Sequence, residues 1–211
     1  ASICTQYHKK VKRCAQASTS KRITMQPIIL ASKSPRRKQL LEWAEIPFEI
    51  IAQHTDETFP SHMEVQSVPE YIALSKAEAV QQQVAANQII LAADTVVVLD
   101  NQIIGKPMDR NDAVSILHRL SGQTHHVITG VVLLKGAEII SFADISEVSF
   151  HTLSTTQISF YVEKYQPYDK AGAYAIQEWI GVVGIKKIHG DFYNVMGLPI
   201  SRVVQALTQF A

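Results

Sequence analysis

The sequence predicts a mixed α/β fold in which a twisted β-sheet is flanked by helices, and three observations lead to this class. First, an apolar run from Ile28 to Ala31 breaks off into a polar turn and is followed by an amphipathic helix pattern. Second, strand and helix patterns continue to alternate up to residue 123, which is typical of α/β proteins. Third, residues 124–153 alternate between apolar and polar side chains as two or three antiparallel strands do.

The first helix carries positive charge at an unusual position. Ser34 is a good N-cap residue and Pro35 suits the first helical position, so we expect the helix to begin there. Arg36 and Arg37 then lie in its first turn, where the helix dipole favours anions over cations. Two interpretations remain open. Either a phosphate binds the free backbone N–H groups and both arginines, or the arginines are solvated or paired with a surface carboxylate.

The next segment joins an acidic loop to a helix. Residues 47–62 predict a short strand that runs into a polar loop carrying Asp56 and Glu57. Residues 68–85 predict a helix with one apolar face, and this helix contains Lys76. The acidic loop is therefore followed at once by a helix that carries a cation.

A long apolar strand occupies the middle of the chain. Residues 88–108 predict this strand, a turn at Asp100 and Asn101, and a returning strand that ends near Lys106. Residues 109–123 predict a helix. After the antiparallel strands, the pattern predicts a helix at 155–165, a loop at 166–181, strands at 182–190 and 192–196, and a last helix at 199–210.

Charge is distributed unevenly along the chain. Of 20 basic residues, six lie in residues 1–24, which contain no acid, and the 14 that remain stand against 19 acids. We expect residues 1–24 to be a flexible basic leader ahead of Met25, or alternatively an organelle transit peptide, and residues 25–211 to form a single domain. Because the domain is net acidic, we expect no specific nucleic-acid partner.

Cysteines and apolar runs limit the chemistry and the location. Both cysteines, Cys4 and Cys14, lie in the leader, so residues 25–211 offer no thiol for a nucleophile, a cysteine zinc site or an internal disulfide. A reducing compartment fits this distribution, and we expect a cytoplasmic protein. No apolar run approaches the roughly 20 residues of a membrane helix, so no membrane partner is expected.

Asp94 stands alone between two apolar runs of one predicted strand, and the pattern indicates burial on both faces. An ionised carboxylate there is costly unless it is paired or bound to a metal. Asp94 is therefore either a structural acid or, together with Glu57, a ligand of a divalent cation that also binds phosphate oxygens. Lys76 and Lys106 would add positive charge to the same cleft, although Lys106 also suits an ordinary turn.

The familiar motifs of other nucleotide enzymes and hydrolases are absent. The sequence has no GxxxxGK[ST] loop, GxGxxG, GxSxG or HExxH. His125 and His126 are adjacent in a predicted strand and would point to opposite faces, so we expect them to be structural or exposed and not a metal pair.

Eight ordered motifs resemble the Maf family of nucleoside triphosphate pyrophosphatases. They are LASKSPRRKQLL, DE at residues 56–57, LSKAEA, AADTVVV, GKP, LSGQTHHVITGV, YDKAGAYAIQ and NVMGLP, spread over residues 28–210. The resemblance implies an α/β fold of the Maf/ITPase-like type, with two lobes around a central substrate cleft, and a homodimer. It also implies hydrolysis of a nucleoside triphosphate to the monophosphate and pyrophosphate with a divalent cation, Mg²⁺ in the first place or Mn²⁺.

Matched motif by motif, the resemblance implies roles for eight residues. The substrate-binding residues would be Ser32, Arg36, Arg37 and Gln177, with both arginines on the triphosphate and Gln177 at the base. The catalytic residues would be Glu57, Lys76, Asp94 and Lys106, of which Glu57 and Asp94 would bind the metal.

The segment DKAGAYAIQ resembles the branch that acts on dTTP and UTP. This chain has Ala175 and Glu178 where that branch usually has glycines, and both add a side chain near the expected base. The implied function is a house-cleaning dTTP/UTP pyrophosphatase that also removes modified pyrimidine nucleotides. The alternatives are a 7-methyl-GTP pyrophosphatase of the sister branch, a non-catalytic nucleotide-binding regulator of cell division, and a nucleic-acid binder that acts through the basic leader.

Overall fold

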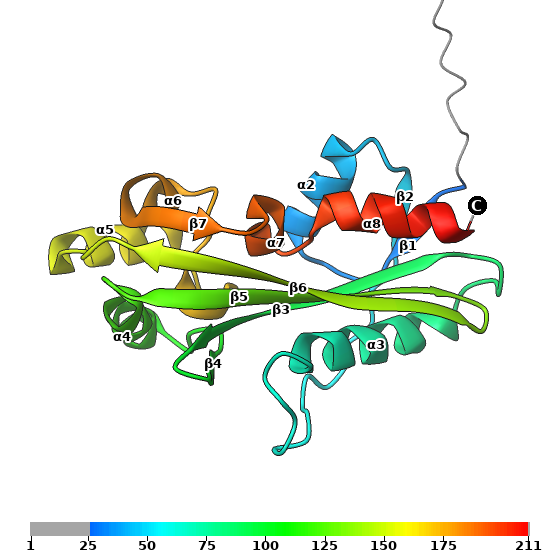
Figure 1. Cartoon of the computed structure of the whole chain (residues 1–211), viewed down its shortest axis with the longest axis horizontal. Helices are drawn as coiled ribbons and strands as arrows, with labels where there is room; N and C mark the ends of the chain where they lie inside the picture. The colour runs from blue at the N-terminus through cyan, green and yellow to red at the C-terminus, as the bar shows by residue number, and fades with distance from the viewer. Residues whose placement is uncertain (1–25, 211) are drawn as a thin grey trace, which may run out of the picture.

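The computed structural model describes residues 26–210, which form one mixed sheet with helices on both faces (Figure 1). The strands are β1 (Ile28–Leu30), β2 (Phe48–Ile50), β3 (Ile90–Leu99), β4 (Gln102–Ile104), β5 (Thr124–Lys135), β6 (Glu138–Phe150) and β7 (Ile185–His189). The helices are α2 (Pro35–Trp43), α3 (Val68–Gln81), α4 (Arg110–Leu120), α5 (Thr155–Tyr165), α6 (Trp179–Gly184), α7 (Phe192–Met196) and α8 (Ile200–Leu207), with 3₁₀ turns η1 (Ala171–Ala173) and η2 (Thr208–Phe210). The predicted mixed α/β class is confirmed.

A short stretch of β3 lacks a neighbouring strand on one of its two edges. In the described residues the strands run in the order β2-β1-β3-β5-β6-β7, with β4 paired to β3 off this path. β1 is parallel to β2 and β3, whereas the other pairs are antiparallel. β1 pairs with β3 only as far as Leu91, and β4 joins β3 only from Val97, so residues 92–96 have no strand beside them on this edge. Ligands of open α/β sheets bind at such carboxyl ends of parallel strands.

Side chains of β3 alternate between two cores on opposite faces of the sheet. Leu91 belongs to the main core with α2 and α4, whereas Ala92 packs with Ala77 of α3 in a second core. The same alternation continues through the stretch without a neighbouring strand. Asp94 therefore faces the side of α3, and Thr95 faces the side of α2.

Helix α3 is held close to the sheet at Gly130 of β5. A Cβ atom at Gly130 would lie 2.2 Å from the backbone nitrogen of Glu70, so only glycine allows this approach. Gly130 is also the partner of Asp94 across the β3–β5 ladder. The start of α3 is thereby fixed beside Asp94, and Lys76 follows within two turns of the helix.

Two predicted elements near the C-terminus are wrong. Residues 192–196, predicted as a strand, form helix α7, because the Asp191 side chain accepts the backbone N–H of Tyr193 and caps the helix. Residues 179–184, predicted as the end of a loop and the start of a strand, form helix α6, and the strand begins only at Ile185. The predicted helix 68–85 ends earlier, at Gln81.

The helices lie in two groups along the sheet. One group lies near one end and consists of α4, α5 and α6, and the other lies nearer the opposite end and consists of α2, α3 and α8 (Figure 1). No helix among the described residues is long and apolar enough to cross a membrane. The leader predicted for residues 1–24 lies outside the described residues.

Candidate active site

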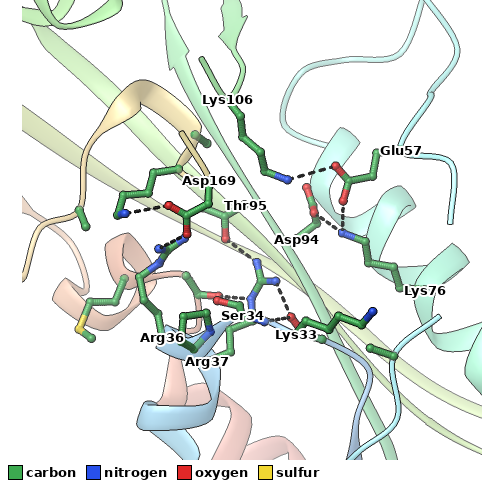
Figure 2. Close-up of a pocket in the computed structure, with 18 of the residues that line it drawn as sticks. Lys33, Ser34, Arg36, Arg37, Glu57, Lys76, Asp94, Thr95, Lys106 and Asp169 are labelled. Atoms are coloured by element: carbon green, nitrogen blue, oxygen red, sulfur yellow. Dashed lines mark hydrogen bonds and ion pairs between the residues drawn. The ribbon is translucent and has the colours of Figure 1, made fainter. Parts of the chain in front are cut away.

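A cavity of about 720 Å³ lies beside the uncovered stretch of β3 (Figure 2). This volume is within the range of small-molecule sites. The cavity is lined by all eight residues that the sequence singles out, namely Ser32, Arg36, Arg37, Glu57, Lys76, Asp94, Lys106 and Gln177. The structure thus brings together side chains from segments far apart in the chain.

Glu57, Lys76, Asp94 and Lys106 form the lysine–carboxylate cluster on one side of the cavity (Figure 2). Lys76 Nζ donates to Glu57 Oε1 at 2.7 Å and to Asp94 Oδ1 at 2.6 Å, and Lys106 Nζ lies 3.5 Å from Glu57 Oε2. The side chains of Lys76 and Asp94 are only 15% and 13% exposed, so this pair is largely shielded from water. Burial would raise the pKa of Glu57, but Lys76 and Lys106 outweigh it and hold this pKa below its usual value.

The two carboxylates of this cluster fit a divalent cation that arrives with phosphate. The carboxylates of Glu57 and Asp94 both point toward the ammonium group of Lys76, which lies between them. In the part of the chain that the structure describes, no group of three or more His, Cys, Asp or Glu side chains is placed to hold a metal ion. Mg²⁺ is commonly held by one or two carboxylates and completes its shell with water and phosphate oxygens, so a pair is sufficient.

Arg37 is buried and directs its guanidinium group to uncharged acceptors of the protein. Nε donates to Gly197 O at 2.8 Å, Nη1 to Ser32 Oγ at 3.1 Å and Nη2 to Thr95 Oγ1 at 3.0 Å. Burial lowers the pKa of Arg37, and nearby Asp94 opposes this effect. A guanidinium group nevertheless keeps its charge in proteins. Arg37 is thus a fixed positive charge that has three of its five N–H groups bound to the protein.

Arg36 is more open and pairs with a carboxylate. Its Nη1 lies 3.4 Å from Asp169 Oδ2, and its side chain is 21% exposed. For Arg36 the surface-carboxylate interpretation therefore describes this structure. Ser34 occupies the predicted N-cap position, but its hydroxyl makes no capping bond. The hydroxyl of Ser32 accepts the N–H of Ser34 at 3.2 Å instead.

The segment around Gln177 forms a further part of the cavity wall. Gln177 is exposed and lines the cavity, and the buried Ala175 lines it too. The Glu178 carboxylate is turned away, because it accepts a hydrogen bond from Tyr161 and lies 3.6 Å from Lys170 Nζ. Glu178 is not among the residues that line the cavity.

The two adjacent histidines behave as the strand period predicts. His125 is buried and its Nε2 is hydrogen-bonded to Tyr174 Oη at 2.7 Å, whereas His126 is exposed. Among the described residues neither histidine belongs to a group of three or more potential metal ligands. Tyr174 connects the buried histidine to the cavity wall.

Several residues of the cavity were not singled out by the sequence, and four of them take part in the contacts around the arginines. Thr95, Asp169, Lys170 and Gly197 line it and contact the arginines or each other. Each lies inside a motif already noted, next to Asp94, within YDKAGAYAIQ or within NVMGLP. Position inside a motif was therefore the available signal, although it does not say which side chain faces the cavity.

The charge of the lining residues suits a polyanion. Six cations, Lys33, Arg36, Arg37, Lys76, Lys106 and Lys170, stand against four carboxylates, Asp56, Glu57, Asp94 and Asp169. An excess of two positive charges concentrated in one concave site attracts an anion, even though residues 25–211 are net acidic.

A family model described as Maf-like protein matches residues 27–210. The chain belongs to the Maf family. The resemblance seen in the eight motifs is therefore confirmed. Among Maf-family relatives, a protein of Cytophaga hutchinsonii named dTTP/UTP pyrophosphatase is 49% identical over 180 residues, covering 85% of this chain and 82% of the relative.

Two further relatives bear the same name, dTTP/UTP pyrophosphatase. The protein of Parabacteroides distasonis is 44% identical over 87% of this chain and 95% of its own length. That of Bacillus mycoides is 44% identical over 88% of this chain and 96% of its own length. Among solved structures, the Staphylococcus aureus Ham1 protein has a TM-score of 0.48 and 15% identity, covering 87% of this chain and 98% of that chain.

Proposed function

We propose that this Maf-family protein hydrolyses nucleoside triphosphates, dTTP and UTP first among them, to the monophosphate and pyrophosphate. The observation that carries the proposal is the cavity in which arginines and lysines from opposite sides surround a pair of carboxylates. Three relatives that are 44–49% identical and cover most of this chain are named dTTP/UTP pyrophosphatase, which supports the same substrate class.

The triphosphate would lie between the arginines of α2 and the lysine–carboxylate cluster. Arg36 would exchange its exposed contact with Asp169 for phosphate oxygens, because a bidentate phosphate contact is the stronger interaction. Ser32 and the free N–H groups at the start of α2 would bind further phosphate oxygens. Arg37 would contribute mainly its fixed charge, since most of its N–H groups hold protein acceptors.

The reaction would take place at the α-phosphorus. Asp94 orients a water molecule and accepts its proton as the new oxygen–phosphorus bond forms. The bond from the α-phosphorus to the bridging oxygen breaks, and pyrophosphate leaves with its negative charge toward Lys76 and Lys106. Positioning and charge neutralisation are the main requirements of phosphoryl chemistry, and this cluster provides both.

A divalent cation held by Glu57 and Asp94 would supply further neutralisation of the phosphate charge. Lys76 keeps both carboxylates directed into the cavity. If the carboxylates turn to another cation, the ammonium group of Lys76 becomes free to contact phosphate oxygens. The negative charge of the carboxylates would then be balanced by the cation, and that of the phosphates by Lys76.

Gln177 is our candidate for reading the base. A glutamine amide offers one acceptor and two donor hydrogens, so it can pair with both a donor and an acceptor on the imide edge of uracil or thymine. Gln177 lines the cavity and is exposed.

A panel of triphosphates tests the proposal. Purified protein is assayed with dTTP, UTP, CTP, ATP, GTP, 7-methyl-GTP and modified pyrimidine triphosphates, each with Mg²⁺ or Mn²⁺, and pyrophosphate and phosphate are measured separately. We expect pyrophosphate, fastest with dTTP and UTP. In oxygen-18 water the label should appear in the monophosphate, since water attacks the α-phosphorus.

The other outcomes would overturn parts of the proposal. A preference for 7-methyl-GTP would assign the protein to the sister branch. Tight nucleotide binding without pyrophosphate release from any triphosphate would favour the regulator of cell division. Release of phosphate alone would place the attack at the γ-phosphorus and contradict the mechanism.

We further infer a homodimer and a cytoplasmic location from the family resemblance. Light scattering of the purified chain checks the first, and a monomer at micromolar concentration would contradict it. Cell fractionation checks the second.

A further inference from the structure

The residues that present Gln177 form a tight turn with little freedom. The N–H of Glu178 donates to Ala175 O at 3.1 Å and closes the turn, which we term the 175–178 turn. Gly181 packs against its backbone, since a Cβ atom there would lie 1.7 Å from Ile176 O. Only glycine fits at this position, so the close packing of Gly181 fixes the backbone of Ile176 next to Gln177.

Tyr161 of α5 joins the two ends of the 175–178 turn. Its side chain is wholly buried, and its hydroxyl accepts the N–H of Ala175 at 3.2 Å while donating to the Glu178 carboxylate. Burial and then the hydrogen bond to Glu178 raise the pKa of Tyr161 far above its ordinary value. The hydroxyl therefore remains a donor at any working pH.

Contacts continue from this turn to the phosphate end of the cavity. Lys170 Nζ lies 3.6 Å from Glu178 Oε1 and donates to Asp169 Oδ1 at 2.7 Å, and Asp169 pairs with Arg36. Lys170 is only 8% exposed although it lines the cavity, so its position is well defined. The hydroxyl of Tyr161 is thus the buried end of a chain of contacts that reaches Arg36.

We propose that Tyr161 is a positioning residue for recognition of a uracil or thymine base, acting through the 175–178 turn on the side-chain amide of Gln177. The inference rests on the proposed function. Tyr161 itself does not line the cavity. Without its hydroxyl, the N–H of Ala175 and the carboxylate of Glu178 each lose a partner, and the amide of Gln177 samples more orientations. The protein then discriminates less well between uracil or thymine and other bases, while the contacts to the phosphates persist.

The test compares Tyr161→Phe with the matched control Tyr165→Phe. Tyr165 lies one turn further along α5 and stacks on Tyr161 with ring centroids 5.0 Å apart. We measure kcat and KM for UTP, dTTP and CTP, and inhibition by inorganic tripolyphosphate, which has no base. Tyr161→Phe should lower the preference for UTP over CTP by roughly 2- to 12-fold. This is the effect of losing one neutral hydrogen bond, here the one between the Gln177 amide and the base. For Tyr161→Phe, KM for UTP should change more than kcat, and tripolyphosphate should inhibit as before. Tyr165→Phe should change neither the substrate preference nor the inhibition by tripolyphosphate.

A second pair of variants protects the test against misfolding of Tyr161→Phe. Glu178→Leu removes the acceptor of the Tyr161 hydroxyl and should reduce the same preference, whereas Glu178→Gln keeps an acceptor oxygen and should retain it. The inference is overturned if Tyr161→Phe and Glu178→Leu both discriminate as the wild type does, or if tripolyphosphate inhibition weakens in parallel with the loss of preference. Failure of the wild type to release pyrophosphate from any triphosphate would instead overturn the proposed function, and the inference with it.

Discussion

Replacement of Asp94 by asparagine distinguishes a catalytic role of this residue from a purely structural one. Asparagine has nearly the same shape, but it has neither the negative charge to hold a cation nor the basicity to accept a proton from water. We expect Asp94→Asn to lower turnover by roughly 10²–10⁴-fold, the usual contribution of a general base, and by more if metal binding is lost too. Nucleotide affinity should fall less, because Arg36, Arg37 and Lys106 line the same cavity and would still bind the phosphates.

The cost of this substitution in stability follows from the partners of Lys76. Its Nζ lies 2.6 Å from Asp94 and 2.7 Å from Glu57, so the ammonium group keeps one carboxylate when Asp94 loses its charge. The loss is then one charge-assisted hydrogen bond of about 1.5–3 kcal/mol, and not the roughly 3–5 kcal/mol of an unpaired buried charge. For a domain of this size, Tm should fall by roughly 3–12 °C.

Turnover, affinity for a non-hydrolysable triphosphate and Tm are measured together. Asp144→Asn is the matched control, because Asp144 is similarly shielded at 18% exposure and pairs with Arg202 at 3.1 Å, yet it does not line the cavity. The control should lose some stability and keep its turnover. A folded Asp94→Asn variant with near wild-type turnover would rule out Asp94 as the catalytic base. A joint loss of Tm, binding and activity would make Asp94 a structural acid.

Three further changes test the leader, the candidate base-reading residue and a buried histidine. A chain that begins at Met25 should keep full specific activity in the pyrophosphate assay, because the residues that line the cavity lie between 31 and 197; a large loss would contradict this. Gln177→Ala should narrow the gap between the best and the other triphosphates by roughly 5- to 150-fold, and unchanged relative rates would assign base reading to another residue. Burial, with a smaller effect of His126, lowers the pKa of His125 from 6.5 to about 4. Its neutral form therefore stabilises the fold above about pH 6.5, and this contribution of up to about 3 kcal/mol is lost as the pH falls toward 4. His125→Gln should show a smaller fall in the free energy of unfolding between about pH 7 and pH 4, measured with denaturant, and an equal fall would place the pH dependence in other groups.

The parts of the fold that the sequence predicts depend on local signals. Pro35 is found at the first position of α2, as its missing N–H favours, and the turn at Asp100 and Asn101 adopts the positive φ angles that such residues tolerate. The isolated acid of the apolar strand is also found as expected, shielded and paired. Each of these features is decided by a few adjacent residues, so the sequence is sufficient to predict them.

The errors arise where a neighbouring cap overrides intrinsic preference. The segment FYNVM is rich in aromatic and β-branched residues, which favour a strand. Asp191 caps it at the front, and Gly197 ends it with φ of 114°, a conformation that favours glycine. Five residues between such signals form a turn of helix, and the composition of so short a segment is a weak predictor.

Contacts between distant segments are not predictable from one sequence by physical rules. The acceptors of Arg37 include Thr95, 58 residues away, and Gly197, 160 residues away. Only the folded sheet brings these groups together, because Thr95 faces the side of α2 in the uncovered stretch of β3. Family motifs indicate that such residues share a site, but they do not distinguish a residue that binds substrate from one that holds the site in shape.

The two adjacent arginines of α2 show why that distinction matters. Consecutive helical residues differ by about 100° around the axis, so Arg36 and Arg37 meet different surroundings. Arg36 has its charge balanced by the exposed carboxylate of Asp169, and it can leave that partner at little cost because surface ion pairs are weak. Arg37 is buried among uncharged acceptors, and a buried charge without an opposite charge in contact is unfavourable for the fold. A bound polyanion would offset this cost. We therefore expect the guanidinium group that binds Ser32, Thr95 and Gly197 to favour phosphate binding through its charge, and Arg36 to contribute by exchanging Asp169 for phosphate oxygens.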